Sequence, residues 1–353
     1  MNKTKDKKAL VFISAGLGDA LLLIPLVRHL KEHGYSVTGI ITSALPCEEL
    51  FSGTDLFAEL VPARTKLSLF RYAFVTGKAF DLCILNYFSC SRSNLIAAKR
   101  MGKLVHTNRF PEKAGKNMRA GVRFIEPMED LHDAEQNMLL AGSGKRKLSE
   151  ELLLLNRPVK PVMTLPSNFI ALQISAGNNR FSYKNWPVSG WIAFLKQSKA
   201  NFPELQFILL GEQGEAGLAE EVMQGGTGNV LNMVGKTTVF QALEVIQRST
   251  FFLGLDGGMM HAAVVSGKPT FSIWGPSNPS LYGYEQLNPE KNRVISLFLP
   301  CSPCSAWIRP NTSRVNNPEL CPDHKCLQEL KPAQVFREFS IFVNKHAPIQ
   351  NHP

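Results

Sequence analysis

The segment LGLDGGMMHAA at positions 253–263 decides the fold class of this 353-residue chain. An apolar run over 250–255 ends in an acid and two glycines, and a helical pattern follows. A strand that turns through glycines into a helix is typical of a parallel α/β sheet. The N-terminus of such a helix can bind a phosphate through backbone N–H groups and the helix dipole. The segment predicts a binding site formed by Asp256, Gly257, Gly258 and His261, although a histidine here is equally typical of a buried core.

A related segment, SAGLGDA at positions 14–20, joins an apolar run over 9–14 to a helical pattern over 20–31. Gly16 and Gly18 allow a ligand to approach the backbone closely. Asp19 is either a helix-capping carboxylate or a general base presented at the edge of the sheet. A dinucleotide-binding fingerprint would need a third glycine at Leu21 and an acid after the second strand. Neither is present, so a dehydrogenase is not expected.

Strands and helices alternate in two blocks of similar size. Further strands are predicted over 35–41, 80–85, 169–174, 205–210 and 269–273, and helices over 94–100, 186–200, 239–247 and 331–345. Three prolines between Asn156 and Asn168 mark a linker. We predict an α/β protein with an N-terminal domain over 1–157, a linker over 158–168, a C-terminal domain over 169–330 and a closing helix and tail over 331–353.

The net charge of +10 indicates an anionic partner. Between 92 and 123, nine Lys or Arg stand against one acid, so this stretch is either a solvated basic face or a docking surface. No RNA-binding signature accompanies it, so a nucleic-acid partner is not expected. The apolar stretch over 9–30 is interrupted by Asp19 and Pro25, and nowhere do about 18 apolar residues run without a break. Neither a signal peptide nor a membrane span is expected, and the predicted location is the cytoplasm.

The second block carries cations near its first strand. Asn179 and Arg180 end a glycine-containing turn, and Lys184 begins the motif KNWP, so all three are suited to grip a diphosphate. The segment VGKTT at 234–238 imitates a phosphate loop, but the glycine that the loop requires is replaced by Val230. Thr237 or Thr238 is expected to cap the next helix instead. The chain has no Asp-x-Asp pair to hold a divalent metal.

Seven cysteines, an odd number, argue against a disulfide framework. Four of them cluster near the C-terminal end of the second block, with His324 among them: Cys301, Cys304, Cys321 and Cys326. The cluster predicts a structural zinc or iron ion, and free thiols in a loop are the alternative.

Together these motifs resemble glycosyltransferase family 9, the heptosyltransferases of lipopolysaccharide core synthesis, from Leu10 to about Leu330. The carriers are the Gly-Leu-Gly-Asp turn with Pro25, Lys-x-Trp-Pro, Val-Gly-Lys-Thr, Asp-Gly-Gly-x-x-His-Ala-Ala, and Gly-Lys-Pro followed by Gly-Pro-Ser. The resemblance implies a GT-B fold, with two Rossmann-like doubly wound domains facing a central cleft. The N-terminal domain would bind the acceptor and the C-terminal domain the nucleotide-sugar donor.

The resemblance also implies an inverting transfer that needs no metal cofactor, with ADP-heptose as the donor. Asp19 matches the catalytic base and Lys184 the lysine that grips the donor phosphates. Asp256 matches the acid that contacts the donor sugar, and Glu215 matches the acid that holds the ribose. The other donor-binding residues would be Gly16, Gly18, Asn179, Arg180, Gly257, Gly258 and His261. The chain departs from the family at Asn179-Arg180 and at Gly257, where the family often has Thr.

The expected acceptor is an anionic glycolipid, the lipopolysaccharide inner core or another lipid A-linked acceptor, reached by peripheral contact with the cytoplasmic face of the inner membrane. The basic stretch 92–123 would dock its head group. Three alternatives remain open: a nucleotide-sugar epimerase or hydrolase, a heptosyltransferase that modifies a protein, and a non-catalytic nucleotide-sugar binder.

Overall fold

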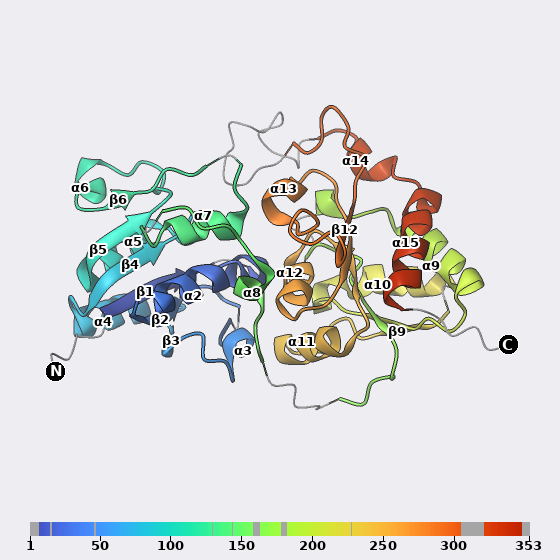
Figure 1. Cartoon of the computed structure of the whole chain (residues 1–353), viewed down its shortest axis with the longest axis horizontal. Coiled ribbons are helices and arrows are strands. Elements are labelled where there is room, and N and C mark those ends of the chain that lie inside the picture. The colour runs from blue at the N-terminus through green and yellow to red at the C-terminus, as the bar shows by residue number, and fades with distance from the viewer. Residues whose placement is uncertain are drawn as a thin grey trace. The chain divides into compact units, whose positions relative to one another are not determined.

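The computed structural model describes residues 7–14, 16–45, 47–128, 130–142, 144–157, 163–177, 182–226, 228–304 and 321–347. The chain divides into two compact units, unit 1 over Met1–Pro158 and unit 2 over Val159–Pro353 (Figure 1). Among the described residues, no helix combines the length and the hydropathy that a membrane crossing requires.

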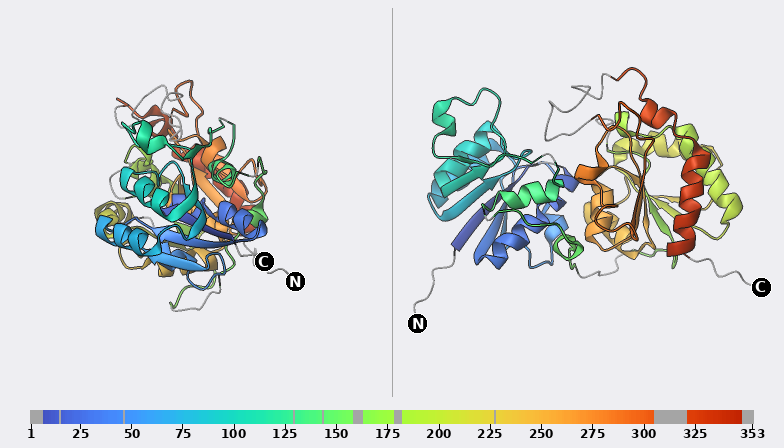
Figure 2. Two further views of the ribbon diagram at one scale, coloured as in Figure 1. Left: turned by 90° about the vertical axis from the view of Figure 1, so that its left-hand side faces the viewer. Right: turned by 45° about the horizontal axis from the view of Figure 1, so that its top comes forward.

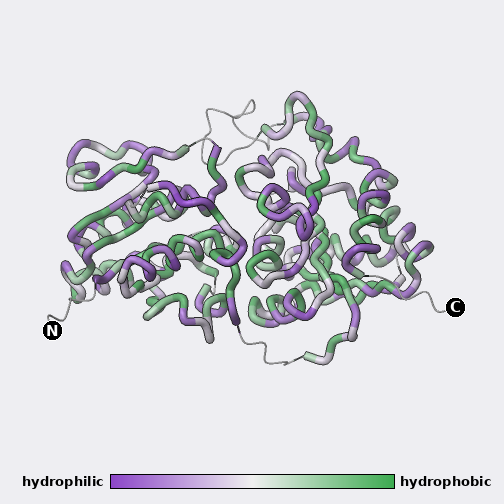
Figure 3. Tube along the Cα trace, viewed as in Figure 1, coloured by the Kyte–Doolittle hydropathy of each residue, from purple (hydrophilic) through white to green (hydrophobic). Residues whose placement is uncertain are grey.

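Unit 1 is built on a six-stranded parallel sheet in the order β3-β2-β1-β4-β5-β6. Its strands are β1 (Lys7–Ile13), β2 (Tyr35–Ile41), β3 (Glu59–Pro62), β4 (Phe80–Leu85), β5 (Gly102–Thr107) and β6 (Arg123–Phe124). The strands predicted over 35–41 and 80–85 are confirmed by β2 and β4. The central strands are almost wholly apolar because helices cover both faces of the sheet (Figure 3).

The helices of unit 1 are α1 (Leu17–Leu21), α2 (Ile24–Glu32), α3 (Cys47–Phe51), α4 (Lys66–Thr76), α5 (Arg92–Met101), α6 (Lys116–Arg119), α7 (Asp133–Leu139) and α8 (Glu150–Leu153). Helix α2 packs with α7 and α8, and α4 packs with α5. The single helix predicted over 20–31 is wrong in one respect, since Leu22 and Leu23 separate α1 from α2. Pro25 has no backbone N–H for the carbonyl of Leu21, so the first helix ends before it.

Unit 2 repeats the design with the order β12-β11-β10-β7-β8-β9, again all parallel. Its strands are β7 (Ile170–Leu172), β8 (Phe207–Leu209), β9 (Val230–Asn232), β10 (Phe252–Leu255), β11 (Thr270–Ile273) and β12 (Asn292–Ile295). Counted within each unit, both sheets therefore have the strand order 3-2-1-4-5-6 of a doubly wound nucleotide-binding fold.

The longer helices of unit 2 are α9 (Val188–Asn201), α10 (Ala216–Gln224), α11 (Val239–Arg248), α12 (Gly258–Val265) and α15 (Pro332–His346). Two short helices, α13 (Pro279–Tyr282) and α14 (Lys325–Gln328), lie between α12 and α15 in the chain. Thr238 caps α11 by accepting a hydrogen bond from the Gln241 N–H at 3.2 Å, as predicted. Figure 2 shows helices on both faces of the sheet.

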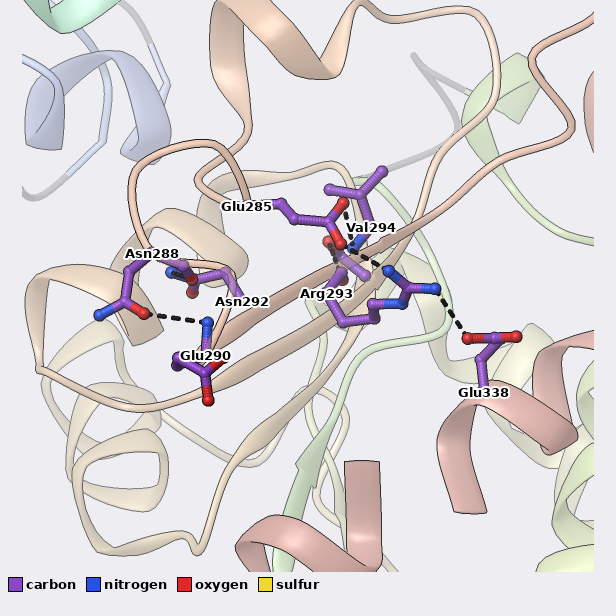
Figure 4. A network of polar contacts seen from close by, with 8 residues as sticks. Glu285, Asn288, Glu290, Asn292, Arg293, Val294 and Glu338 are labelled. Atoms are coloured by element: carbon purple, nitrogen blue, oxygen red, sulfur yellow. Dashed lines mark hydrogen bonds and ion pairs between the residues drawn. The ribbon is translucent and has the colours of Figure 1, made fainter. Parts of the chain in front are cut away.

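Helix α15 belongs to the core of unit 2. Its Phe339 is fully buried, and its ring lies 4.9 Å from Phe194 of α9 and 5.7 Å from Phe271 of β11, measured between centroids. At the edge strand β12, Arg293 binds Glu338 of α15 at 2.7 Å and Glu285 at 2.8 Å (Figure 4). These ion pairs are partly exposed and add little stability, so the aromatic packing holds α15 in place.

We expect Phe339→Ala to lower the free energy of unfolding of unit 2 by about 3–5 kcal/mol, because it leaves a cavity among aromatic rings. All four tryptophans lie after residue 158, so tryptophan fluorescence during urea unfolding reports on unit 2 alone. The control is Ile341→Ala on the same helix, where the side chain is 63% exposed and the change should stay within about 0.5 kcal/mol. Equal effects of the two substitutions would contradict this packing.

Candidate functional site

The loops that follow the central strands occupy equivalent positions in the two sheets. In each unit the first and fourth strands are neighbours, β1 with β4 and β7 with β10. Right-handed crossovers in this strand order take the chain to opposite sides of the sheet after these two strands. Ligands of doubly wound sheets bind outside the carboxyl ends of the strands at this switch point. The predicted segment 14–20 follows β1, and the segment 253–263 runs from the end of β10 into α12, so both include the turn at a switch point.

In unit 1, the residue expected to act as a base lies in the first turn of α1. The carboxylate of Asp19 accepts a hydrogen bond from the Gly16 N–H at 2.9 Å, so it does cap the helix. The side chain is partly exposed, as is Gly18 beside it. The capping and catalytic interpretations of Asp19 are therefore compatible, because the cap orients a carboxylate that solvent and substrate can reach. Gly16 and Gly18 lie in this turn, in unit 1, and their predicted contact with the donor stays a prediction.

A buried amide holds the ends of the central strands of unit 1 together. The Asn94 side chain donates to the hydroxyls of Ser14 and Thr42 at 3.0 and 3.2 Å and to the Ser89 carbonyl at 2.9 Å. Ser14 follows β1, Thr42 follows β2 and Ser89 follows β4. These hydrogen bonds thus fix the position of Ser14, where the turn that carries Asp19 begins.

A second carboxyl group, missed by the sequence analysis, lies close to Asp19. Asp133 begins α7 and is only 3% exposed. Its pKa is raised to about 7, first by burial and then by the negative charge of Asp19, while a hydrogen bond from Asn137 acts in the opposite direction. The Asn137 side chain also donates to the Leu22 carbonyl at 3.2 Å, which ties α7 to the end of α1. Asp133 is therefore a buried acid coupled to the predicted base.

In unit 2, the two predicted donor-site charges form a buried ion pair. The Lys184 Nζ lies 2.6 Å from the Asp256 carboxylate, and the two side chains are 14% and 7% exposed. Burial alone would raise the pKa of Asp256, but Lys184, helped by Ser277 and His261, holds it below its ordinary value. Asp256 is therefore ionised at neutral pH, and the pair places a cation and an anion beside the first turn of α12.

The KNWP motif explains how Lys184 is held. Trp186 is buried, its indole N–H donates to the Leu330 carbonyl at 3.0 Å, and its ring would clash with any Cβ at Gly190. Asn185 accepts a hydrogen bond from the Ala176 N–H at 2.8 Å, so the turn is tied to the loop after β7. Pro187 is the N-cap residue of α9. Lys184 thus projects from a turn fixed on both sides.

His261 lies in the second turn of α12 and is 5% exposed. Burial lowers its pKa to about 4, so the imidazole is neutral at pH 7. Its Nδ1 and the hydroxyl of Tyr284 are 2.7 Å apart. The histidine is therefore a hydrogen-bonded core residue, and its predicted contact with the donor stays a prediction.

Gly257 is the N-cap residue of α12 and Gly258 its first residue, as the motif predicts. The nearest atom to a Cβ added at Gly257 would be the Gln173 side-chain oxygen at 3.5 Å, an ordinary contact. That oxygen is buried and receives no hydrogen bond from the described residues. A methyl group would therefore fit at Gly257 without displacing its neighbours, and a buried unpaired acceptor lies next to it.

Glu215 lies at the carboxyl end of β8, in the 3-10 turn Gln213–Glu215 (η2). One carboxylate oxygen accepts a hydrogen bond from the Glu212 N–H at 2.8 Å, and it occupies the space that a side chain at Gly211 would need. The other oxygen is buried and has no hydrogen-bond partner among the described residues. A buried unpaired acceptor is costly, so it favours a ligand that donates hydrogen bonds, such as a sugar hydroxyl.

Asn179 and Arg180 lie outside the described residues, so their predicted role stays a prediction. The four clustered cysteines are described: Cys301, Cys304, Cys321 and Cys326. Burial and then the charge of Cys304 raise the pKa of Cys326 to about 11, so these two thiols are near one another. Within the described part of the chain, however, no three His, Cys, Asp or Glu side chains are grouped so that they could hold a metal ion. The structural metal rests on the sequence alone.

We expect Asp133→Asn to stabilise unit 1 at pH 8 and to have little effect near pH 4. The folded-state pKa of about 7 lies above the ordinary 3.8, so the Asp133 contribution to stability is present below about pH 4 and lost as the pH rises through 7. Asn cannot ionise, so the gain should reach at most about 4 kcal/mol. Urea unfolding followed by circular dichroism measures it, with tryptophan fluorescence reporting unit 2 separately. A difference that is the same at both pH values would contradict the raised pKa.

Comparisons with known proteins agree with this geometry. Residues 142–311 match the family model "Glycosyltransferase family 9 (heptosyltransferase)". Lipooligosaccharide heptosyltransferase 2 of Campylobacter jejuni subsp. jejuni serotype O:6 is 23% identical, over 94% of this chain and 98% of its own length.

Among solved structures, E. coli ADP-heptose lipopolysaccharide heptosyltransferase II superimposes with a TM-score of 0.68 at 18% identity, over 96% of this chain and 98% of that one. E. coli heptosyltransferase WaaC with ADP gives a TM-score of 0.60 at 14% identity, over 97% and 100%. The fold is thus the predicted GT-B fold. The residues matched by the family model contain Lys184, Glu215 and Asp256, the described charged residues of the unit 2 site. Residues 142–311 thus carry the match to glycosyltransferase family 9, the heptosyltransferases, and the whole chain is similar to lipooligosaccharide heptosyltransferase 2.

Proposed function

We propose that this glycosyltransferase moves a heptose from ADP-heptose to the inner core of lipopolysaccharide or to another lipid A-linked acceptor, with inversion at the anomeric carbon. The buried Lys184–Asp256 pair at the first turn of α12 carries the proposal, because it is a polar site within the residues matched by the family model. The names of the relatives support the donor and the acceptor: one is an ADP-heptose lipopolysaccharide heptosyltransferase and another binds ADP.

Asp19 is the proposed base. It takes the proton from the acceptor hydroxyl while that oxygen attacks the anomeric carbon. The Gly16 N–H holds the carboxylate in one orientation. The neighbouring Asp133, when ionised, disfavours a second negative charge nearby and so makes Asp19 a better proton acceptor.

Unit 2 binds the donor in this proposal. As the bond to the sugar breaks, negative charge grows on the nucleoside diphosphate, and Lys184 and the N-terminus of α12 stabilise it. Asp256 orients Lys184 and accepts hydrogen bonds from the donor sugar. The unpaired oxygen of Glu215 accepts a hydrogen bond from the ribose. In this proposal Lys184 and the N-terminus of α12 offset the charge of the leaving group, so no metal cofactor is needed.

The acceptor is anionic and linked to a lipid, so the proposed place of action is the cytoplasmic face of the inner membrane. The excess of basic residues in unit 1 supports this, since a positive surface attracts phosphorylated head groups.

We expect Asp19→Asn to lower kcat by about 10²–10⁴-fold and to leave donor affinity unchanged, because the substitution removes only the proton acceptor. The Asn side-chain oxygen can still accept the Gly16 hydrogen bond, so α1 keeps its cap. Transfer from ADP-heptose to a deacylated core acceptor is measured as the release of ADP. Donor binding is measured by calorimetry.

The outcomes separate the alternatives. Release of ADP without transfer to an acceptor would indicate an epimerase or hydrolase. Binding of ADP-heptose without turnover, equal in both proteins, would indicate a non-catalytic binder. Wild-type transfer that Asp19→Asn leaves unchanged would remove Asp19 from the mechanism.

We expect Lys184→Met to abolish detectable donor binding and to lower the free energy of unfolding of unit 2 by about 3–5 kcal/mol, because Asp256 is left as a buried unpaired charge. The double variant Lys184→Met/Asp256→Asn should recover most of this stability, since the buried charge is gone, but it should not recover transfer. A double variant that is no more stable than Lys184→Met would show that the pair is not coupled.

A further inference from the structure

Helix α4 presents large apolar side chains to the outside of unit 1. Leu67, Phe74 and Val75 are 81%, 73% and 79% exposed, and Phe70 is exposed as well. Six of the ten exposed large apolar side chains among the described residues fall between positions 64 and 123, four of them on this helix. Apolar side chains gathered in this way on a protein surface mark a site of interaction.

The outward position of these side chains is fixed by the other face of the helix. Leu69 and Ala73 are buried in the core of unit 1, where α4 packs with α5 (Figures 1 and 2). Leu67, Phe70 and Phe74 follow one another at intervals of three and four residues, so they share one outer face. Helix α4 therefore has two apolar faces, and only the face with Leu69 and Ala73 packs against the core of unit 1.

Basic residues flank this apolar face. Lys66 and Arg71 are exposed on α4, and Arg92 and Arg100 are exposed on α5. The Arg100 guanidinium lies 5.0 Å from the centroid of the Phe74 ring, so the two helices form one continuous surface. Neither helix contains an acid.

The charge of the chain is concentrated in the same segment. Positions 64–123 contain thirteen Lys or Arg and two acids, while the rest of the chain contains 26 Lys or Arg and 27 acids. The net charge of +10 therefore comes from this segment alone. Its partner must be anionic and must also accept aliphatic groups. Leu67 and Val75 cannot stack on bases as aromatic rings do, so an anionic lipid bilayer fits better than a nucleic acid.

We propose that α4 is the helix by which the protein docks on an anionic bilayer, with Leu67, Phe70, Phe74 and Val75 inserted among the lipid head groups and the basic residues of α4 and α5 bound to phosphates. The inference deepens the proposed function and rests on it in one respect, because a transferase with a lipid-linked acceptor works at a membrane. It moves the contact from the stretch 92–123 alone to a helix that precedes it.

The test is flotation of the full chain with vesicles of 70% phosphatidylcholine and 30% phosphatidylglycerol, compared with vesicles of phosphatidylcholine alone. The variant Leu67→Ser/Phe74→Ser/Val75→Ser should bind the anionic vesicles at least about tenfold more weakly, because three apolar groups no longer insert. Arg71→Glu/Arg100→Glu should lose the preference for anionic vesicles, by about fivefold per charge. The matched control Leu231→Ser/Ile341→Ser removes exposed apolar side chains from unit 2 and should bind like the wild type.

Equal binding by the triple variant and the wild type, or wild-type binding that ignores phosphatidylglycerol, would overturn the proposal. So would a wild-type dimer in light scattering that the triple variant converts to a monomer, because a second copy would then cover α4. Thermal melting confirms that each variant is folded.

Transfer to the deacylated acceptor is measured in parallel and should be unchanged in the triple apolar variant, since Leu67, Phe74 and Val75 belong to neither the proposed donor site nor the basic stretch 92–123. A wild type that binds anionic vesicles through α4 but transfers no heptose would refute the proposed function and leave this surface standing.

Discussion

The constraint on which the structure depends is the position of the first strand beside the fourth in each parallel sheet. Parallel strands need crossover connections, and the chain crosses to one side after the first strand and to the other side after the fourth. The loops at the carboxyl ends of these two strands therefore diverge and leave backbone N–H groups and side chains uncovered. In unit 1 this point carries Asp19, and in unit 2 it carries Asp256. The strand order of the sheet thus determines where polar groups can contact a ligand, whichever side chains occupy these positions.

The two units use this shared geometry with opposite electrostatics. At the switch point of unit 1 a buried carboxyl group lies near another, and the pKa of Asp133 is raised. At the switch point of unit 2 a lysine lies against the carboxylate, and the pKa of Asp256 is lowered. The first arrangement favours uptake of a proton, and the second provides a cation beside a helix N-terminus. These are the two requirements of glycosyl transfer, a base for the acceptor and positive charge for the departing diphosphate.

The sequence predicts the fold well where burial is continuous and poorly where polar residues are buried. Strands β2 and β4 are apolar runs between turns, so their bounds could be read directly. Helix α7 was missed because Asp133, Gln136 and Asn137 face inward and break the apolar periodicity. Asp133 lies near Asp19 only in the folded chain, where Asn137 of the same helix bonds to Leu22, 115 positions away. The motifs identified Lys184 and Asp256 separately, but their 2.6 Å contact joins residues 72 positions apart, which no local pattern contains.

The Lys184–Asp256 pair is itself an argument for function. Removing two charges from water costs several kcal/mol per ion, and their attraction barely offsets that cost, so a pair of apolar side chains would hold the same turn equally well. Stability therefore does not explain why Lys184, whose side chain is only 14% exposed, lies beside Asp256. The binding of an anionic ligand would explain the buried lysine, because such a ligand would meet a cation that is already desolvated and fixed by Trp186 and Asn185. Preorganised charge of this kind stabilises a developing anion without reorganisation, and a flexible surface lysine would not.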